Sequence, residues 1–256
     1  MNSPHAPEKP KPHPRYGELT THHSAAQIDR LFLMSLRRKY LYCPVSKVAN
    51  SSIKGFLYEA ELRAHGIPRN ARDFTTAQVH NLLFGPLLNP YQVPANILRK
   101  MLYGEETVRI LFTRNPVDRV LSCYLDRVLT PASVPSKLIQ SALKIDRAED
   151  ISFDAFISVV AEQDIREMNP HWRPIYYEAC CDAVTYNRIY QFEALQDGLR
   201  SILTEIYPRW AADIDLGTNL SPAKTRAADR IAEFVTPAIR TKIEKIYEKD
   251  FQTFGY

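Results

Sequence analysis

Two short apolar runs, each followed by polar residues and then by a helix-like stretch, restrict the fold of this chain more than any other feature. They are YLYC at 40–43 and VRILFT at 108–113, and a third run, NRIYQFE at 187–193, precedes a helical stretch at 195–206. Short buried strands that alternate with helices are typical of α/β proteins. We therefore expect an α/β, three-layer fold in which helices flank a central, mainly parallel sheet. Ligands bind such sheets beyond the carboxyl ends of the strands.

The first 25 residues differ in composition from the rest of the chain. Five prolines fall within the first fourteen positions, and large aliphatic residues are almost absent. Such a segment buries little apolar surface, so we expect residues 1–25 to form a disordered or loosely docked tail. The remainder, 26–256, has the length of a single domain. Amphipathic patterns predict further helices at 51–64, at 152–164 and around Ile239, Ile243 and Ile246.

Composition excludes several classes of protein. The 33 basic and 29 acidic residues give a small positive excess, which suits an anionic small molecule, and there is no basic stripe with interleaved aromatics to bind nucleic acid. The chain has no run of about twenty apolar residues, so we expect no transmembrane span, and it shows no signal-peptide pattern. The four cysteines lack zinc-ligand spacing and lie in apolar stretches, which predicts buried free thiols. These features together predict a reducing, cytoplasmic location.

The first strand–helix junction, CPVSKVANSSIKG at 43–55, has the chemistry of an anion site. A helix that begins near Asn50 leaves its first N–H groups unpaired and presents its positive dipole end. Lys47 adds a charge, while Asn50, Ser51 and Ser52 add side-chain donors. The pattern GxxxxGK[ST] of nucleotide-binding loops is absent, since this loop contains no glycine, and no magnesium-binding carboxylate is evident. A simpler alternative is a helix capped by Asn50 or Ser51 with Lys47 exposed.

The second junction, FTRNPVDRVLSCY at 112–124, offers another cation at a strand end. The planar guanidinium of Arg114 can hold a phosphate by two hydrogen bonds, and Ser122 follows two helical turns later. We expect Asn115 as the helix N-cap, Pro116 at the first helical position and Asp118 in a capping box. The alternative is that Arg114 pairs with Asp118. Two anion sites at neighbouring strand ends suit a nucleotide with anions at its 5′ and 3′ positions.

Four blocks of the sequence resemble a single family. CPVSKVANSSIKGFL is similar to the 5′-phosphosulfate loop of sulfotransferases that use 3′-phosphoadenylyl sulfate (PAPS). ILFTRNPVDRVLSCY resembles their 3′-phosphate segment, F-x-R-x-P-x-x-R-x-x-S-x-Y. NPHWRPIYYEACCDAVTYNRIYQFEALQDG and the terminal IYEKDFQTFGY resemble segments of the Golgi carbohydrate sulfotransferases of the chondroitin and HNK-1 type. The blocks span residues 38–256 in the family's order.

The resemblance implies a fold related to the P-loop kinases and a metal-free, in-line transfer of a sulfuryl group. PAPS would be the donor, PAP the product, and a hydroxyl or amine of a carbohydrate or glycoconjugate the acceptor. Lys47 would then stabilise charge on the bridging oxygen of the 5′-phosphosulfate. The 5′ group would be held by Asn50, Ser51 and Ser52 with the backbone of Val48 and Ala49, and the 3′-phosphate by Arg114 and Ser122.

This chain also departs from the Golgi relatives. Their membrane anchor and C-x-x-C pattern are missing, and Cys180 and Cys181 are adjacent instead. The resemblance therefore predicts a soluble, bacterial type of relative, for which the Golgi setting and its glycans do not carry over directly.

Transfer to a hydroxyl requires a base, for which a histidine has a suitable pKa. Outside the tail the chain has His65, His80 and His171. His65 precedes a glycine at a helix end and is expected to contact the helix C-terminus. His80, in TTAQVHNLLFGP between the two anion segments, is the predicted catalytic base. His171 of NPHWRP and the carboxylate of Glu193 are the alternatives.

Two other functions fit parts of the pattern. A nucleotide-dependent kinase or other phosphotransferase would use a related fold with ATP and magnesium. A non-catalytic nucleotide-binding module would keep the fold alone, although the intact set of Lys47, Arg114 and Ser122 argues against it. A sulfotransferase is the leading hypothesis.

Overall fold

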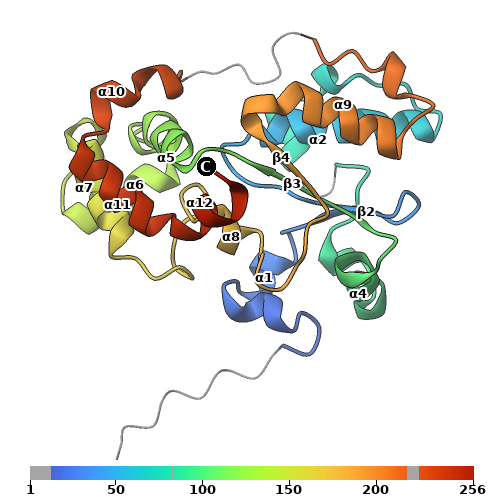
Figure 1. Ribbon diagram of the computed structural model, residues 1–256, viewed down its shortest axis with the longest axis horizontal. Helices are drawn as coiled ribbons and strands as arrows, with labels where there is room; N and C mark the ends of the chain where they lie inside the picture. Colours follow the sequence, from blue (N-terminus) through green and yellow to red (C-terminus); the bar gives the residue numbers. More distant parts are fainter. Residues whose placement is uncertain (1–12, 82–83, 218–224) are drawn as a thin grey trace, which may run out of the picture.

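The central sheet of the computed structural model confirms the expected α/β fold. The structure describes residues 13–81, 84–217 and 225–256 (Figure 1). Within them the strand order is β1 (Leu33–Ser35), β2 (Tyr40–Cys43), β3 (Val108–Thr113) and β4 (Arg188–Gln191). Strands β2, β3 and β4 are parallel, and β1 is antiparallel to β2. The three predicted strands are confirmed, whereas β1 was not predicted because three residues carry too short a pattern.

Helices cover both faces of the sheet and give the predicted three layers. The helices α2 (Asn50–Ala64) and α9 (Leu195–Ile206) lie together on one face, and α4 (Ala95–Tyr103) lies on the other (Figure 1). One apolar core joins them to the strands through Phe56 of α2, Ile202 of α9 and Leu98 of α4. None of the helices in the described residues has the length and apolar character needed to cross a bilayer.

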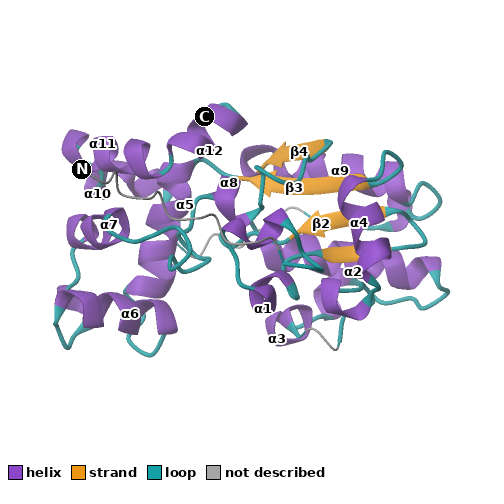
Figure 2. Cartoon of the chain, turned by 90° about the horizontal axis from the view of Figure 1, so that it is seen from below, coloured by secondary structure: helices purple, strands orange, loops and turns teal. Residues whose placement is uncertain are grey.

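A second group of helices lies beyond the carboxyl ends of the parallel strands (Figure 2). Its members are α5 (Pro116–Cys123), α6 (Val134–Leu143), α7 (Phe153–Ala161), α10 (Ile231–Phe234), α11 (Pro237–Ile246) and α12 (Glu248–Phe254). A π-helical turn, Tyr124–Val128, continues α5. Trp172 is fully buried in this group and packs edge-on against Phe156 with ring centroids 5.6 Å apart. The chain therefore has two hydrophobic cores, one around the sheet and one within this helical group.

The shorter helices are α1 (Ala25–Ile28), α3 (Thr76–His80) and α8 (Ile175–Glu178). His80 is the last residue of α3, which Thr75 caps by accepting a hydrogen bond from the backbone N–H of Gln78. The helix expected at 152–164 is α7, and Ser152 caps it.

All four cysteines are free, and Cys43, Cys123 and Cys180 are buried.

The N-terminal segment differs from its prediction. Residues 1–12 lie outside the described residues, but residues 13–25 pack on the domain, with Tyr16, Leu19 and His23 buried. Arg166 donates hydrogen bonds to the backbone carbonyls of Thr20 and Thr21 at 2.9 and 2.7 Å. The prolines before residue 15 dominate the composition of this segment. The prediction therefore overlooked the apolar residues that follow, such as Tyr16 and Leu19, which pack on the domain.

His23 makes the stability of this segment sensitive to acid. Its Nδ1 accepts a hydrogen bond from Arg173 at 3.0 Å, and its Nε2 lies 3.0 Å from the carbonyl oxygen of Tyr177. Burial, and next the charge of Arg173, lowers the pKa of His23 to about 4, against 6.5 for a free histidine. The unfolded chain therefore binds a proton between these values and the folded chain does not, so stability is lost as the pH falls.

Comparison with His23→Gln isolates this effect. We expect the free energy of unfolding of the wild type to fall by about 2 kcal/mol more than that of the variant between pH 7.5 and pH 5. Urea unfolding at several pH values measures it. Parallel pH curves for the two proteins would contradict the proposed protonation state of His23.

Candidate functional site

A cavity of about 740 Å³ lies where the carboxyl ends of the strands meet the helical group. Its volume is in the range of small-molecule sites. Its wall includes the loop after β2, the start of α2, α3, Arg114 after β3, the end of α5, the π-helical turn and residues 225–229. The predicted site residues that line it are Lys47, Ala49, Asn50, Ser51, Ser52, His80, Arg114, Ser122 and His171. Val48 and Glu193 are not among the lining residues.

The loop after β2 leaves the N-terminus of α2 open to a ligand. Lys47 and Ala49 have positive φ angles of 69° and 60°, a conformation that costs non-glycine residues roughly 1–2 kcal/mol each. Ala49 is the N-cap and makes no side-chain capping bond, so α2 is not capped by Asn50 or Ser51 as the simpler alternative required. The side chain of Val48 is fully buried, which leaves only its backbone for a ligand.

Lys47 is held inside the cavity by an acidic partner from the π-helical turn. Its Nζ lies 2.7 Å from Oδ2 of Asp126, and the Lys47 side chain is only 13% exposed. Burial lowers the pKa of Lys47, and the hydrogen bond and charge of Asp126 oppose that shift. Arg127 also contacts Asp126, with 3.2 Å between Nε and Oδ2. Lys47 is therefore a largely buried lysine whose charge lies in the cavity, and not an exposed surface lysine.

Arg114 and Ser122 form a second polar corner of the same cavity. The Nη1 of Arg114 donates to the carbonyl of Lys47 at 3.0 Å, and the guanidinium lies 4.3 Å from the ring centroid of Phe192. Its buried Nε has no hydrogen-bond partner among the described residues. Ser122 is buried, and its hydroxyl lies 3.3 Å from that of Thr225. This corner has a hydrogen-bond donor without a partner among the described residues, Nε of Arg114, so it fits an anion.

No ion pair joins Arg114 to Asp118 in the described residues, although the negative charge of Asp118 favours the charged guanidinium. Asn115 is the N-cap of α5, and its Oδ1 accepts from Val117 N at 3.0 Å, as predicted. The capping box with Asp118 does not form. Instead, the N–H of Asn115 donates to Oε1 of Glu193 at 3.0 Å. Glu193, which follows β4, thus supplies the carboxylate that the local sequence pattern assigned to Asp118.

Arg119 holds the two halves of the site together. The side chain is fully buried, and its Nε donates to the carbonyl of Ser46 at 3.0 Å. Its Nη1 and Nη2 donate to the carbonyls of Arg173 and Pro170 at 2.8 and 3.2 Å. One guanidinium therefore fixes the loop after β2 (residues 44–49, the anion loop) against the segment that carries His171.

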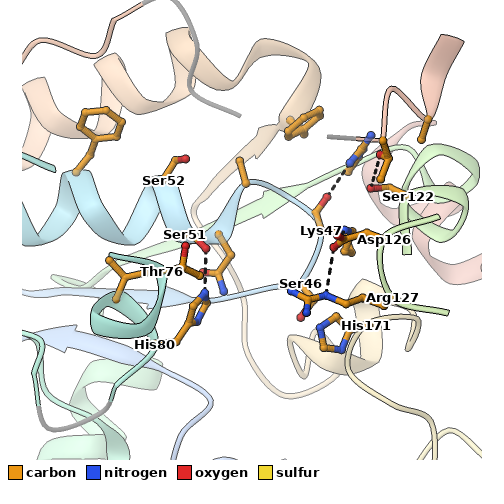
Figure 3. A pocket seen from close by; sticks show the side chains of 18 of the residues that line it. Ser46, Lys47, Ser51, Ser52, Thr76, His80, Ser122, Asp126, Arg127 and His171 are labelled. Atoms are coloured by element: carbon orange, nitrogen blue, oxygen red, sulfur yellow. Dashed lines mark hydrogen bonds and ion pairs between the residues drawn. The ribbon is translucent and has the colours of Figure 1, made fainter. Parts of the chain in front are cut away.

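The structure separates the candidate bases. Nδ1 of His65 lies 2.8 Å from the carbonyl of Glu61, which confirms its position at the end of α2. His80 lines the cavity, with its Nε2 2.9 Å from the hydroxyl of Ser51 (Figure 3). Partial burial, and next the charges of Lys54 and Arg127, lowers the pKa of His80 to about 4. Oε1 of Glu193 accepts from Asn115, and its Oε2 lies 3.2 Å from the hydroxyl of Tyr256.

A sequence profile of the sulfotransferase family matches residues 30–256. The chain belongs to the sulfotransferase family. Over 184 residues this sulfotransferase is 27% identical to carbohydrate sulfotransferase 14 of Mus musculus, covering 68% of this chain and 46% of that protein. It is 25% identical over 258 residues to carbohydrate sulfotransferase 12 of Mus musculus, covering 86% and 58% of the two chains. The chain spans about half the length of these curated relatives. No solved structure matches it.

Several residues that line the cavity of this sulfotransferase escaped the sequence-based prediction. They are Asp126, Arg127, Phe192, Thr225 and Arg226. Asp126 follows Ser122 by four residues on the same helical face, and this spacing could have revealed it. The other four carry no comparable local signal. In the described ranges, no group of three His, Cys, Asp or Glu side chains is placed to hold a metal ion.

Proposed function

We propose that this sulfotransferase binds PAPS with its 5′-phosphosulfate at the start of α2 and its 3′-phosphate between Arg114 and Ser122. The observation that carries the proposal is that two anion-binding corners at neighbouring strand ends open into one cavity. The start of α2, which no side chain caps, suits the first anion, and Nε of Arg114, which has no hydrogen-bond partner among the described residues, suits the second. Membership of the sulfotransferase family supports PAPS as the donor.

Within this proposal Lys47 stabilises the leaving group. In-line transfer breaks the bond between sulfur and the bridging oxygen, so negative charge accumulates on that oxygen. Lys47 extends from the anion loop into the cavity, and its ammonium can donate to the bridging oxygen by leaving Asp126. A charge placed where the transition state develops its own opposite charge lowers the barrier directly. Asn50, Ser51 and Ser52 would hold the non-bridging oxygens.

The acceptor is proposed to be a hydroxyl group of a carbohydrate or glycoconjugate. The similarity to carbohydrate sulfotransferases 12 and 14 supports this class. A base must take the acceptor proton. His80 is the base proposed from the sequence, and His171 lines the same cavity. Glu193 is disfavoured since both of its oxygens already have hydrogen-bond partners at the start of α5 and at Tyr256.

Transfer of [³⁵S]sulfate from PAPS to a panel of free glycans, glycolipids and glycoproteins tests the proposed reaction. We expect label in at least one carbohydrate acceptor, with release of PAP, and none when PAPS is omitted. The absence of any transfer from PAPS to the whole panel, together with an absence of PAP binding by calorimetry, would contradict the proposal.

A paired measurement with Arg114→Ala tests the placement of the 3′-phosphate. PAP and 5′-AMP differ only by that phosphate, so the variant should weaken PAP binding roughly 100-fold and leave 5′-AMP binding within about threefold. Isothermal titration calorimetry measures both. Arg147→Ala, which removes an exposed arginine outside the cavity lining, is the matched control and should leave both affinities unchanged. Equal losses for the two nucleotides would place Arg114 elsewhere on the ligand.

A further inference from the structure

We infer that His171 takes the proton from the acceptor hydroxyl, and that Asn169 positions it by fixing which ring nitrogen is free. The inference rests on the proposed function and decides between the two histidines of the cavity. Three independent features of the structure carry it: the hydrogen bonds of Asn169, the anchoring by Arg119, and the different engagement of His80.

Asn169 determines the tautomer of His171. The backbone N–H of His171 can only donate, and it lies 3.0 Å from Oδ1 of Asn169, so the amide atom at that position is the oxygen. The same oxygen lies 2.8 Å from Nδ1 of His171 and must accept from it. The proton of the neutral imidazole is therefore on Nδ1, and Nε2 carries a lone pair that accepts no hydrogen bond from the described residues. The backbone carbonyl of Asn169 also accepts from the N–H groups of Trp172 and Arg173, which makes the turn rigid.

Arg119 holds the segment of His171 beside the loop that carries Lys47. It binds the carbonyls of Pro170 and Arg173 on either side of His171, and the carbonyl of Ser46 next to Lys47. Figure 3 shows the ring of His171 beneath Arg127, near the pair of Lys47 and Asp126. The base and the charge that stabilises the leaving oxygen thus belong to one rigid unit, as in-line transfer requires.

The charges around His171 keep it neutral and ready to accept a proton. Burial, followed by the positive charges of Arg127, Lys47 and Arg119, lowers its pKa to about 4, and Asp126 opposes them. A bound phosphosulfate places negative charge beside the same cations and offsets their effect. It therefore raises the pKa of His171 toward the ordinary value for histidine. His171 therefore becomes a stronger base when the donor is present.

His80 is engaged on the other side of the anion loop. Its Nε2 shares a hydrogen bond with Ser51, near Thr76 (Figure 3). This contact gives His80 a part in orienting Ser51 toward the 5′ group. In the step itself, the acceptor oxygen bonds to sulfur, its proton moves to Nε2 of His171, and the sulfur–oxygen bond to the 5′-phosphate breaks. The electron pair of that bond stays on the phosphate of PAP beside Lys47.

Kinetics on the acceptor found in the transfer assay test the assignment. His171→Gln should lower kcat roughly 100- to 10,000-fold and leave the affinity for PAP within about threefold. His80→Ala should lower kcat by a smaller factor. Asn169→Leu should lose about tenfold or more, and Asn169→Asp, which keeps an oxygen acceptor for both hydrogen bonds, should restore most of that loss. Wild-type turnover in His171→Gln, or a larger loss in His80→Ala, would overturn the inference.

Nuclear magnetic resonance of the imidazole nitrogens gives a readout that does not depend on activity. At neutral pH His171 should show the Nδ1–H tautomer in the wild type, and Asn169→Leu should lose this preference. Saturating PAP should raise the pKa of His171 by about one unit or more. An Nε2–H tautomer, or a pKa that PAP does not move, would overturn the inference even if a variant folds poorly. Failure of the wild type to bind PAP would instead contradict the proposed function.

Discussion

Replacement of Lys47 by alanine is expected to lower kcat for PAPS-dependent transfer roughly 100- to 1,000-fold, with a much smaller change in PAP affinity. Lys47 is largely buried and directed into the cavity, so its ammonium acts where little water competes for the charge. The interaction strengthens as the bridging oxygen becomes negative, which makes it a transition-state effect. Steady-state [³⁵S]sulfate transfer gives kcat, and calorimetry gives the dissociation constant of PAP.

The control for this experiment is Lys39→Ala. Lys39 also forms an ion pair, with Glu106 at 2.5 Å, but its side chain is 59% exposed and it does not line the cavity. We expect wild-type kinetics for it. Wild-type kinetics for Lys47→Ala would show that the leaving oxygen is stabilised by another group, and the assignment of Lys47 would be wrong.

Arg119→Met is expected to cost the fold more than any other single change proposed here, about 3–5 kcal/mol of unfolding free energy. The variant removes three buried hydrogen bonds and leaves the carbonyls of Ser46, Pro170 and Arg173 without their donor. Arg119→Lys should recover only part of the loss, because one ammonium cannot reach three carbonyls in the plane of a guanidinium. Urea unfolding measures both variants.

Arg99→Met is the matched control, since Arg99 lies exposed on α4. Its free energy of unfolding should stay within about 0.5 kcal/mol of the wild type. If Arg119→Met proved equally mild, Arg119 would not be the link between the anion loop and the His171 segment. The structural basis for placing His171 opposite Lys47 would then be lost.

The sequence predicted much of the sheet half because its signals are local. YLYC and VRILFT are buried strands with the predicted bounds, and the helix at 195–206 has them too. The cap of α5 also follows from neighbours in the chain, as Asn115 bonds to the N–H two residues later. Strand β1 was missed because three residues carry too short a pattern. The packing of residues 13–25 on the domain was missed because it depends on distant partners such as Arg166.

In the candidate site, too, the local features were predicted from the sequence and the long-range contacts were not. The residue types of Lys47, Arg114 and Ser122, and their places after two parallel strands, were readable from the sequence, since strand ends and helix starts depend on contacts within a few residues. Their partners were not. Asp126 meets Lys47 across 79 positions, Glu193 reaches Asn115 across 78, and Arg119 reaches Ser46 across 73.

The sequence by itself therefore determined which groups can bind an anion and at which edge of the sheet they lie. Only the tertiary structure decided which of these groups are buried, which are paired, and which ring nitrogen of His171 is free. Chemical identity and local conformation depend on near neighbours in the chain. Burial and pairing depend on which distant segments meet when the sheet and the helical group pack together, and no local pattern encodes that meeting.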